Sequence, residues 1–275
     1  MIGGIIGDIV GSVYECVNHK SKDFEFFPKY GSYTDDSVLT IATADWLLNG
    51  GEAATYYEDW GNSYPAPFGG YGTGFLNWLD RAARGDFSPY NSCGNGSAMR
   101  VGPVGWAFST LEETLRYARL SADCTHNHPE GIKGAQATAL CIFLARKGET
   151  KVRIKHEVER MFGYDLSWEI DDIRERYSWD GLDHKGNGGV CQDSVPQAIS
   201  CALQAVGFED AVRNAISIGG DSDTIGCIAG SIAEALYGVP CEIYDKAMEY
   251  LPTGMLSVIK RFEAKYGGIF DMVFC

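Results

Sequence analysis

The sequence lacks a basic surface, a long apolar run and a leader-like N-terminus. Its 275 residues hold 37 acidic and 23 basic side chains, for a formal net charge of −14. That balance argues against a nucleic-acid-binding protein, which needs a basic face to displace counterions. No stretch approaches the roughly 18 uncharged apolar residues that a membrane span requires. The N-terminal apolar run has no basic segment before it and is interrupted by Asp8, so we predict no signal peptide.

The chain also lacks a cysteine framework. Its nine cysteines are odd in number, and no two of them have Cys-x-x-Cys spacing. We therefore expect neither a disulfide scaffold nor a structural zinc site. Several thiols, such as Cys141, Cys201 and Cys227, lie in apolar helical stretches. Reduced cysteines are typical of a cytoplasmic protein, and we expect this location.

Helical periodicity dominates what is present. Residues 37–49 place Val38, Ile41 and Trp46 on one face at helical spacing. Three further helices are predicted: one capped by Thr110 with Glu113, one over residues 132–146, and one from Asp193 or Ser194 to Gly207 with Pro196 in its first turn. Only residues 22–28 and 269–274 have weak strand character. We predict an all-α fold and a single domain over residues 1–275, with a charged surface segment over 147–190 that forms a helical hairpin followed by a loop.

Two segments are unusually rich in small residues. Gly3, Gly7 and Gly11 recur every four residues, and residues 226–233 carry a stripe of glycine and alanine at helical spacing. Glycine in a helix interior costs about 0.5–1 kcal/mol relative to alanine. Close approach of two helices is the usual compensation. We therefore predict two tightly crossing helices.

Two adjacent carboxylates, Asp35 and Asp36, stand between Thr34 and Ser37 at the start of an apolar helix. One interpretation is structural, because Thr, Asp and Ser cap helices and acids in a first turn favour the helix dipole. Two adjacent acids exceed what one cap requires, however. They also repel each other unless a cation lies between them, which favours a divalent-metal site.

A second acidic pair, Asp221 and Asp223, opens the helix with the small-residue stripe and is followed by Thr224. Gly219 and Gly220 precede it and permit a positive φ angle or a close approach to an ion. Together the two pairs supply hard oxygen ligands, which suit Mg²⁺ or Mn²⁺ rather than zinc. Two ions bridged by carboxylates would explain why so many acids tolerate one another.

Two polar segments lie between the acidic pairs. A run of Gly, Asn and Ser over residues 91–97 can direct backbone amides at a phosphate, although a plain polar loop has the same composition. His126 and His128 have no Cys or Glu at a matching metal-ligand spacing. We interpret them as substrate-binding or surface histidines.

In this order the segments resemble the ADP-ribosylglycohydrolase family. The matching stretches are 3–15 (GGIIGDIVGSVYE), 33–40 (YTDDSVLT), 94–105 (GNGSAMRVGPVG), 124–140 (CTHNHPEGIKGAQATAL), 193–199 (DSVPQAI) and 217–238 (SIGGDSDTIGCIAGSIAEALYG). The resemblance implies a compact orthogonal helical domain with a binuclear Mg²⁺ or Mn²⁺ centre in a cleft. It implies a hydrolase that releases ADP-ribose from an ADP-ribosylated protein or a small ADP-ribose conjugate. Residues 147–190 contain no matching motif, so the acceptor stays open.

By matching position, the resemblance also implies the site residues. The implied metal ligands are Thr34, Asp35, Asp36, Asp221, Asp223 and Thr224. The implied contacts to the diphosphate and ribose are Ser92, Gly94, Asn95, Gly96 and His126. Glu15 corresponds to a glutamate near the metals, and Glu15, Asp36 or Asp223 would act as acid or base.

The implied chemistry is coherent. Cleavage at the ribose anomeric carbon passes through an oxocarbenium-like state that two carboxylates normally serve, and metals can orient the ribose and lower the pKa of a bound water. Two alternatives remain open. A two-metal phosphohydrolase acting on ADP-ribose or another nucleotide would release AMP or phosphate, and a non-catalytic protein would only bind ADP-ribose. The presence of all four aspartates disfavours the second alternative.

Overall fold

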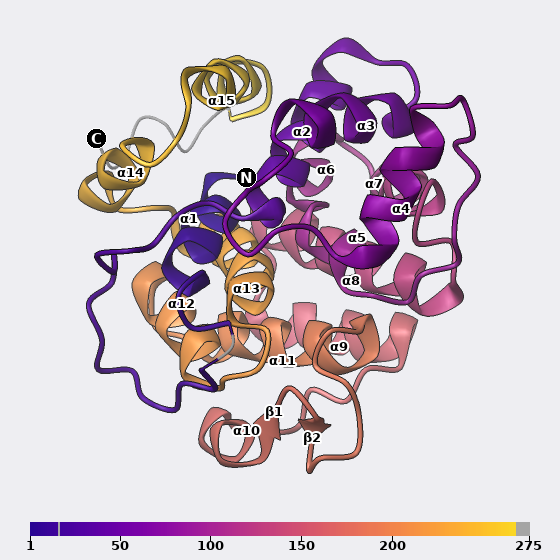
Figure 1. Ribbon diagram of the computed structural model, residues 1–275. Helices are drawn as coiled ribbons and strands as arrows, with labels where there is room; N and C mark the ends of the chain where they lie inside the picture. The colour runs from indigo at the N-terminus through magenta and orange to yellow at the C-terminus, as the bar shows by residue number, and fades with distance from the viewer. Residues whose placement is uncertain (16, 268–275) are drawn as a thin grey trace.

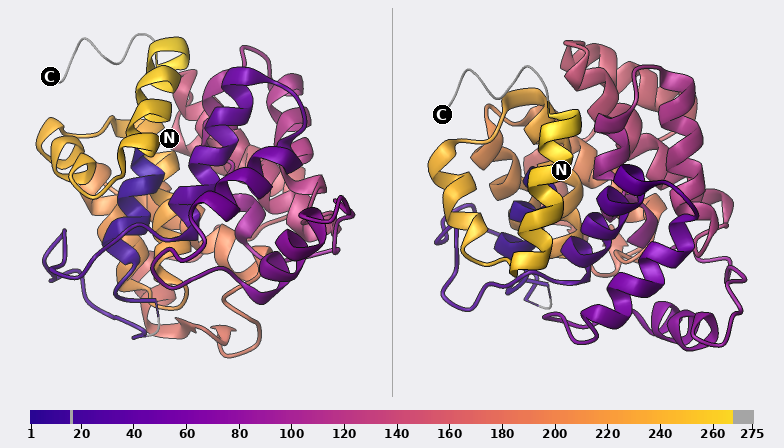
Figure 2. Two further views of the ribbon diagram at one scale, coloured as in Figure 1. Left: turned by 45° about the horizontal axis from the view of Figure 1, so that its top comes forward. Right: turned by 90° about the horizontal axis from the view of Figure 1, so that it is seen from above.

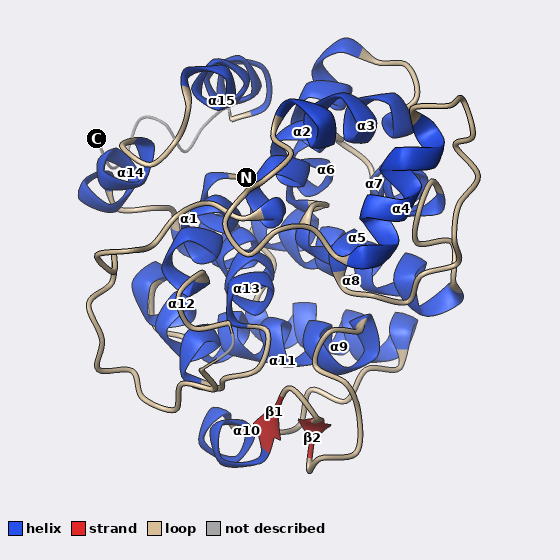
Figure 3. Ribbon diagram, in the orientation of Figure 1, coloured by secondary structure: helices blue, strands red, loops and turns tan. Residues whose placement is uncertain are grey.

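The structure is a computed structural model that describes residues 1–15 and 17–267. Its helices are α1 (Ile2–Gly11), α2 (Asp35–Asn49), α3 (Ala53–Ser63), α4 (Thr73–Ala82), α5 (Gly96–Met99), α6 (Gly102–Ala107), α7 (Leu111–Asp123), α8 (Pro129–Arg146), α9 (Lys151–Phe162), α10 (Ile170–Arg176), α11 (Cys191–Gln204), α12 (Phe208–Ser217), α13 (Ser222–Tyr237), α14 (Cys241–Met248) and α15 (Thr253–Tyr266). Strands β1 (Tyr177–Ser178) and β2 (Gly181–Leu182) form a small antiparallel hairpin. The predicted all-α fold is confirmed (Figure 3).

Helix α13 lies at the centre of the fold. It packs against α1, α8, α11 and α12 (Figure 1). Helix α15 packs on α2 at one edge of the molecule, and the helices cross at varied angles instead of forming a parallel bundle (Figure 2). This arrangement leaves the starts of α2 and α13 close to α1.

Local signals explain where several helices begin. Thr34 accepts a hydrogen bond from the backbone N–H of Asp36 (3.2 Å) and caps α2. Thr110 caps α7 by accepting from the N–H of Glu113 (3.3 Å), and its hydroxyl donates to the Glu113 carboxylate (2.7 Å). These bonds satisfy N–H groups that a helix start leaves unpaired. The predicted helices over 37–49 and after Thr110 are confirmed.

Two local predictions are wrong. Helix α11 begins at Cys191 and ends at Gln204, so Asp193 lies in its first turn rather than at its cap. The Asp193 carboxylate instead accepts the N–H of Asn187 (2.6 Å) and holds the preceding loop. Residues 22–28 form no strand, because the Arg213 guanidinium satisfies two carbonyls of this segment in place of a partner strand. The other strand candidate, 269–274, lies outside the described residues.

The predicted tight crossing is formed by α1 and α13. A β-carbon added at Gly7 would overlap the carbonyl oxygen of Gly226, and one added at Gly3 would overlap that of Gly230. The two backbones are therefore in direct contact, which offsets the cost of glycine in both helices. The crossing holds Asp8 of α1 beside the start of α13.

The charged segment 147–190 contains helices α9 and α10, as expected, followed by the β1–β2 hairpin, which the sequence did not predict. This segment contacts Glu15 and the end of α12. The Trp179 indole N–H donates to the carbonyl of Glu15 (2.6 Å), and the Arg174 guanidinium donates to the hydroxyl of Ser217 (3.0 Å).

Two further expectations concern cysteines and membranes. Free thiols occur at Cys93, Cys124, Cys141, Cys191, Cys201 and Cys227. Cys241 is disulfide-bonded, so the expectation of a chain with only reduced cysteines is wrong at this position. Within residues 1–15 and 17–267, none of the helices combines the length and the apolar character needed to cross a membrane.

Candidate active site

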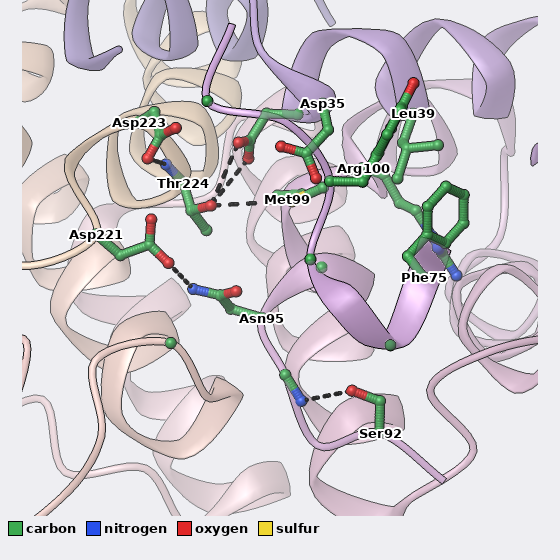
Figure 4. A pocket seen from close by; sticks show the side chains of 18 of the residues that line it. Asp35, Leu39, Phe75, Ser92, Asn95, Met99, Arg100, Asp221, Asp223 and Thr224 are labelled. Carbon is green, nitrogen blue, oxygen red and sulfur yellow. Dashed lines mark hydrogen bonds between the residues drawn. The ribbon is translucent and has the colours of Figure 1, made fainter. Parts of the chain in front are cut away.

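A cleft of about 350 Å³ opens where the starts of α2, α5 and α13 meet. Every site residue predicted from the sequence lines it except Thr34, which is buried beneath its floor. Figure 4 shows Asp221, Asp223 and Thr224 on one side of the cleft, with Asn95 and Ser92 facing them. We call the two sides the acidic wall (Glu15, Asp35, Asp36, Asp221, Asp223 and Thr224) and the polar wall (Ser92, Gly94, Asn95, Gly96 and His126).

The carboxylates of the acidic wall, together with Asp8, form two overlapping groups. Oxygen atoms of Asp8, Asp36 and Asp223 lie within 4.8 Å of one another, and so do those of Glu15, Asp221 and Asp223. Asp223 therefore belongs to both groups. Asp35 belongs to neither group, although it lines the cleft.

The structural interpretation of these aspartates as helix caps does not account for them. At α2, the cap is the hydroxyl of Thr34, and the carboxylate of Asp36 accepts from the Thr224 hydroxyl (3.1 Å). At α13, Asp221 occupies the cap position but makes no side-chain capping bond. Its carboxylate instead accepts from the side-chain amide of Asn95 (2.7 Å), which belongs to the polar wall. Helix capping therefore does not explain why these carboxylates gather at the cleft.

Burial makes the acidic wall electrostatically costly. It raises the pKa of Asp36 and Asp223 well above the usual range, and neighbouring carboxylates raise both further. The pKa of Asp35 is also raised well above normal, first by burial and then by the charge of Asp8. Glu15 is half-buried, and burial followed by the charges of Asp221 and Asp8 raises its pKa. Such a cluster is destabilised at neutral pH unless a cation or protons compensate it.

Sequence reasoning missed the role of Asp8. This fully buried side chain accepts the backbone N–H of Thr34 (2.9 Å), the Thr34 hydroxyl (2.7 Å), the N–H of Ser37 (3.1 Å) and the Ser37 hydroxyl. Burial raises the pKa of Asp8 to about 6, against the lowering effect of these bonds. Asp8 therefore fastens the start of α2 to α1. A single acid inside an otherwise apolar helix was the available signal.

The polar wall has a different composition. The Ser92 hydroxyl accepts the N–H of Gly94 (3.0 Å), which shapes the loop before α5. His126 lies against this loop, and a β-carbon at Gly96 would be 3.0 Å from its Nε2 atom. Burial, followed by the charge of Arg100, lowers the pKa of His126 well below its usual range. The imidazole is therefore neutral at neutral pH.

Aromatic side chains at the cleft also escaped the sequence analysis. Tyr71, Phe75 and Tyr90 line it, and the Tyr71 and Phe75 ring centroids are 5.2 Å apart. Tyr71 lies within a glycine-rich run, 69–74, and Phe75 directly follows it; glycines of this run also line the cleft. The alternation of glycine and aromatic residues there was a signal that could have been used, because glycine allows ligands close approach to the backbone.

Comparisons with known proteins identify the family of the chain. The model of the family described as ADP-ribosylglycohydrolase matches residues 1–264. This match assigns the chain to a class of hydrolases that act on ADP-ribose conjugates. The chain belongs to the ADP-ribosylglycohydrolase family. It is 29% identical to the ADP-ribosylhydrolase ARH3 of Homo sapiens over 87% of this chain and 84% of that protein. It is 25% identical to the ADP-ribosylarginine hydrolase Tri1 of Pseudomonas putida (strain GB-1), over 87% of this chain and 70% of that protein.

A solved structure, described as an ADP-ribosylglycohydrolase-related protein complex, has the same fold. It superposes with a TM-score of 0.70 at 23% identity and covers 96% of this chain and 95% of that one. At this identity the likeness supports the fold and not the details of the site.

Proposed function

We propose that this chain is a metal-dependent hydrolase that cleaves the N- or O-glycosidic bond between ADP-ribose and a modified acceptor and releases ADP-ribose. The observation that carries the proposal is the pair of overlapping buried carboxylate groups opposite a wall without acids. The relatives named as ADP-ribosylhydrolases support the substrate class. The acceptor is either a protein side chain or a small molecule.

Two divalent cations, Mg²⁺ or Mn²⁺, are the proposed cofactors. Their proposed ligands are Thr34, Asp35, Asp36, Asp221, Asp223 and Thr224. The donor set fits such ions, because every donor is a hard oxygen, and the carboxylate of Asp223 lies close enough to those of Asp36 and Asp221 to share a cation with either. The raised pKa values of Asp36 and Asp223 support the same conclusion, since burial and then the repulsion of neighbouring carboxylates raise them, and a bound cation would offset both effects. When bound, such ions supply Lewis-acid polarisation and lower the pKa of water.

Glu15, Asp36 and Asp223 are the proposed acid–base residues. Glu15 has the most suitable environment for proton transfer, because it is half-buried at the cleft and its raised pKa brings protonation nearer to neutral pH. The carboxylates of Asp36 and Asp223 are oriented by Thr224, whose hydroxyl donates to Asp36 (3.1 Å) and whose N–H donates to Asp223 (3.0 Å). Hydrogen bonds thus fix the carboxylates of Asp36 and Asp223, whereas the carboxylate of Glu15 is more exposed.

The polar wall is the proposed site of the diphosphate and ribose, held by Ser92, Gly94, Asn95, Gly96 and His126. Neutral donors and backbone amides suit an anionic ligand whose charge the cations opposite already balance. The aromatic rings of Tyr71, Phe75 and Tyr90 offer apolar faces for the adenine base. The cleft volume of about 350 Å³ lies within the range of small-ligand sites.

A turnover assay tests the proposal. Purified protein receives Mg²⁺, Mn²⁺ or a chelator, together with arginine-linked, serine-linked or O-acetyl ADP-ribose, and the products are identified by mass. We expect intact ADP-ribose and loss of turnover with the chelator. Release of AMP or phosphate would instead indicate attack at phosphorus. An absence of turnover on all three substrates, with metal verified in the protein, would contradict the proposed reaction.

A further inference from the structure

Two side chains behind the polar wall, Arg100 and Thr125, form a chain of contacts that leads to His126 at the cleft. The Arg100 guanidinium is fully buried, and its Nη2 atom donates to the Thr125 hydroxyl oxygen (2.7 Å) and to the carbonyl of Ser121 (2.6 Å). The same Thr125 oxygen lies 2.8 Å from Nδ1 of His126. Thr125 is fully buried and His126 is 6% exposed, at the cleft.

The chemistry of the three groups determines the direction of this chain. A guanidinium only donates hydrogen bonds, so the Thr125 oxygen accepts from Arg100. The one hydroxyl hydrogen of Thr125 then remains available for Nδ1 of His126, which accepts it with its lone pair. A competing acceptor for this hydrogen is the Cys124 sulfur, which is weak. Because a neutral imidazole carries a single N–H, an accepting Nδ1 leaves the hydrogen on Nε2.

The Nε2 atom of His126 has space beside it on the side of the cleft, where a ligand would bind. β-Carbons added at Gly94 and Gly96 would lie 3.6 Å and 3.0 Å from this atom, so the glycines leave space beside the ring. The lowered pKa of His126 supports a neutral ring. Arg100 has no hydrogen-bond partner for its Nε and Nη1 atoms in the described part of the chain. Its charge is instead stacked over the Tyr57 ring, 4.0 Å from the centroid.

We propose that Arg100 and Thr125 are positioning residues that hold His126 as an Nε2–H donor for an oxygen atom of bound ADP-ribose. The ligand in this statement rests on the proposed function, whereas the position of the ring hydrogen does not. The buried positive charge at the far end polarises the chain and makes Nε2–H a stronger donor, since linked hydrogen bonds reinforce one another. Arg100 acts through Thr125, so neither residue needs to contact the ligand.

The ring hydrogen is observed directly by nitrogen NMR of protein labelled with ¹⁵N-histidine. The His126 signals are assigned by their loss in His126→Gln. We expect the free wild-type protein to carry the hydrogen on Nε2. Thr125→Val should lose this preference, and Thr125→Ser, which restores the hydroxyl, should regain it. Hydrogen on Nδ1 in the wild type, or an unchanged spectrum in Thr125→Val, would overturn the proposal.

A matched control is Thr138→Val. Thr138 is fully buried in α8, does not line the cleft, and its hydroxyl has no hydrogen-bond partner among the described residues. This variant makes the same chemical change and should leave the His126 signals unaltered. If Thr125→Val unfolds, the comparison of wild type with Thr125→Ser and the direct reading of the wild-type ring still decide the question.

Calorimetry with ADP-ribose tests the consequence for binding. We expect Thr125→Val to raise Kd about tenfold, the worth of one well-placed hydrogen bond. Thr125→Ser and Thr138→Val should stay near the wild-type value. Unchanged affinity in Thr125→Val would overturn the role in binding. If the wild type shows the Nε2 hydrogen but does not bind ADP-ribose, the proposed function fails while the arrangement of Arg100, Thr125 and His126 stands.

Discussion

The two walls of the cleft are built on opposite electrostatic principles. The acidic wall gathers the carboxylate of Glu15 and those at the starts of α2 and α13, where burial and mutual repulsion raise the pKa values of Asp36 and Asp223. The polar wall presents neutral groups, with a buried cation, Arg100, behind them. A hydrogen bond from Asn95 to Asp221 (2.7 Å) joins the two walls. Under the proposed function, this difference would let one cleft hold cations on one side and the anionic part of the ligand on the other.

Removing the shared acid should have the largest effect. Asp223 belongs to both carboxylate groups, so Asp223→Asn should lower kcat about a thousandfold, since metal stabilisation is worth several kcal/mol. It should also abolish the rise in Tm that Mg²⁺ or Mn²⁺ produces in chelator-treated protein, which is expected to be about 5–10 °C. Steady-state kinetics and thermal unfolding measure the two effects.

The matched control is Asp80→Asn, which changes an exposed aspartate of α4 that pairs with Arg84. It should leave both kcat and the metal-induced rise in Tm at wild-type values. Full turnover in Asp223→Asn would show that the acidic wall takes no part in the reaction.

Breaking the hydrogen bond between the two walls should have the second-largest effect. Asn95→Ala removes the donor that orients Asp221, and groups of this kind are worth about 10–100-fold in metal affinity or activity. We expect kcat to fall by that factor with the fold intact, measured by kinetics over a range of Mn²⁺ concentrations. If excess Mn²⁺ does not recover any of the lost turnover, Asn95 acts on the substrate alone and not through Asp221.

Disturbing the crossing of α1 and α13 should have a smaller effect. Gly7→Ala places a methyl group against the Gly226 carbonyl, which should destabilise the protein by about 1–3 kcal/mol, as overpacking does. Urea unfolding measures this change. Gly207→Ala is the control, because a β-carbon there meets no atom within 4 Å. Equal stability of the two variants would show that the α1–α13 contact is not close in solution.

The smallest expected effect is a pH dependence from the polar wall. Burial, followed by the charge of Arg100, lowers the pKa of His126 well below the ordinary histidine value of about 6.5. Above pH 6.5 the ring is neutral in both folded and unfolded protein. Below it, the unfolded chain takes up a proton that the folded protein does not, so stability falls. Relative to His126→Gln, the wild type should lose about 1 kcal/mol between pH 7.5 and 5.5, measured by urea unfolding. A constant difference would mean that His126 protonates normally in the fold.

Much of this architecture could be predicted from local sequence. The cap at Thr34, the capping box at Thr110 and the small-residue stripes each contain their physical reason within a few residues. The acidic pairs indicated a common site because two caps cannot use four aspartates. However, the family resemblance, and not spacing along the chain, predicted that the two pairs lie close together in space.

Other parts could not be predicted in this way. Asp8 looked like an interruption of an apolar run, because its partners Thr34 and Ser37 lie on another helix. Residues 22–28 had strand-like composition, yet Arg213 from α12 satisfies their carbonyls. The Trp179 contact with Glu15 joins a segment without recognisable motifs to the candidate site.

The sequence by itself determined the helical class, the positions of several helix starts and the oxygen-rich composition of the candidate site, because periodicity, capping and ligand hardness are properties of neighbouring residues. Tertiary structure alone decided which carboxylates share a space, how far burial raises their pKa values, and that Arg100 and Thr125 stand behind His126. These depend on distances between segments far apart in the chain, and those distances arise only when α1 and α13 pack together and bring the other helices into register around them.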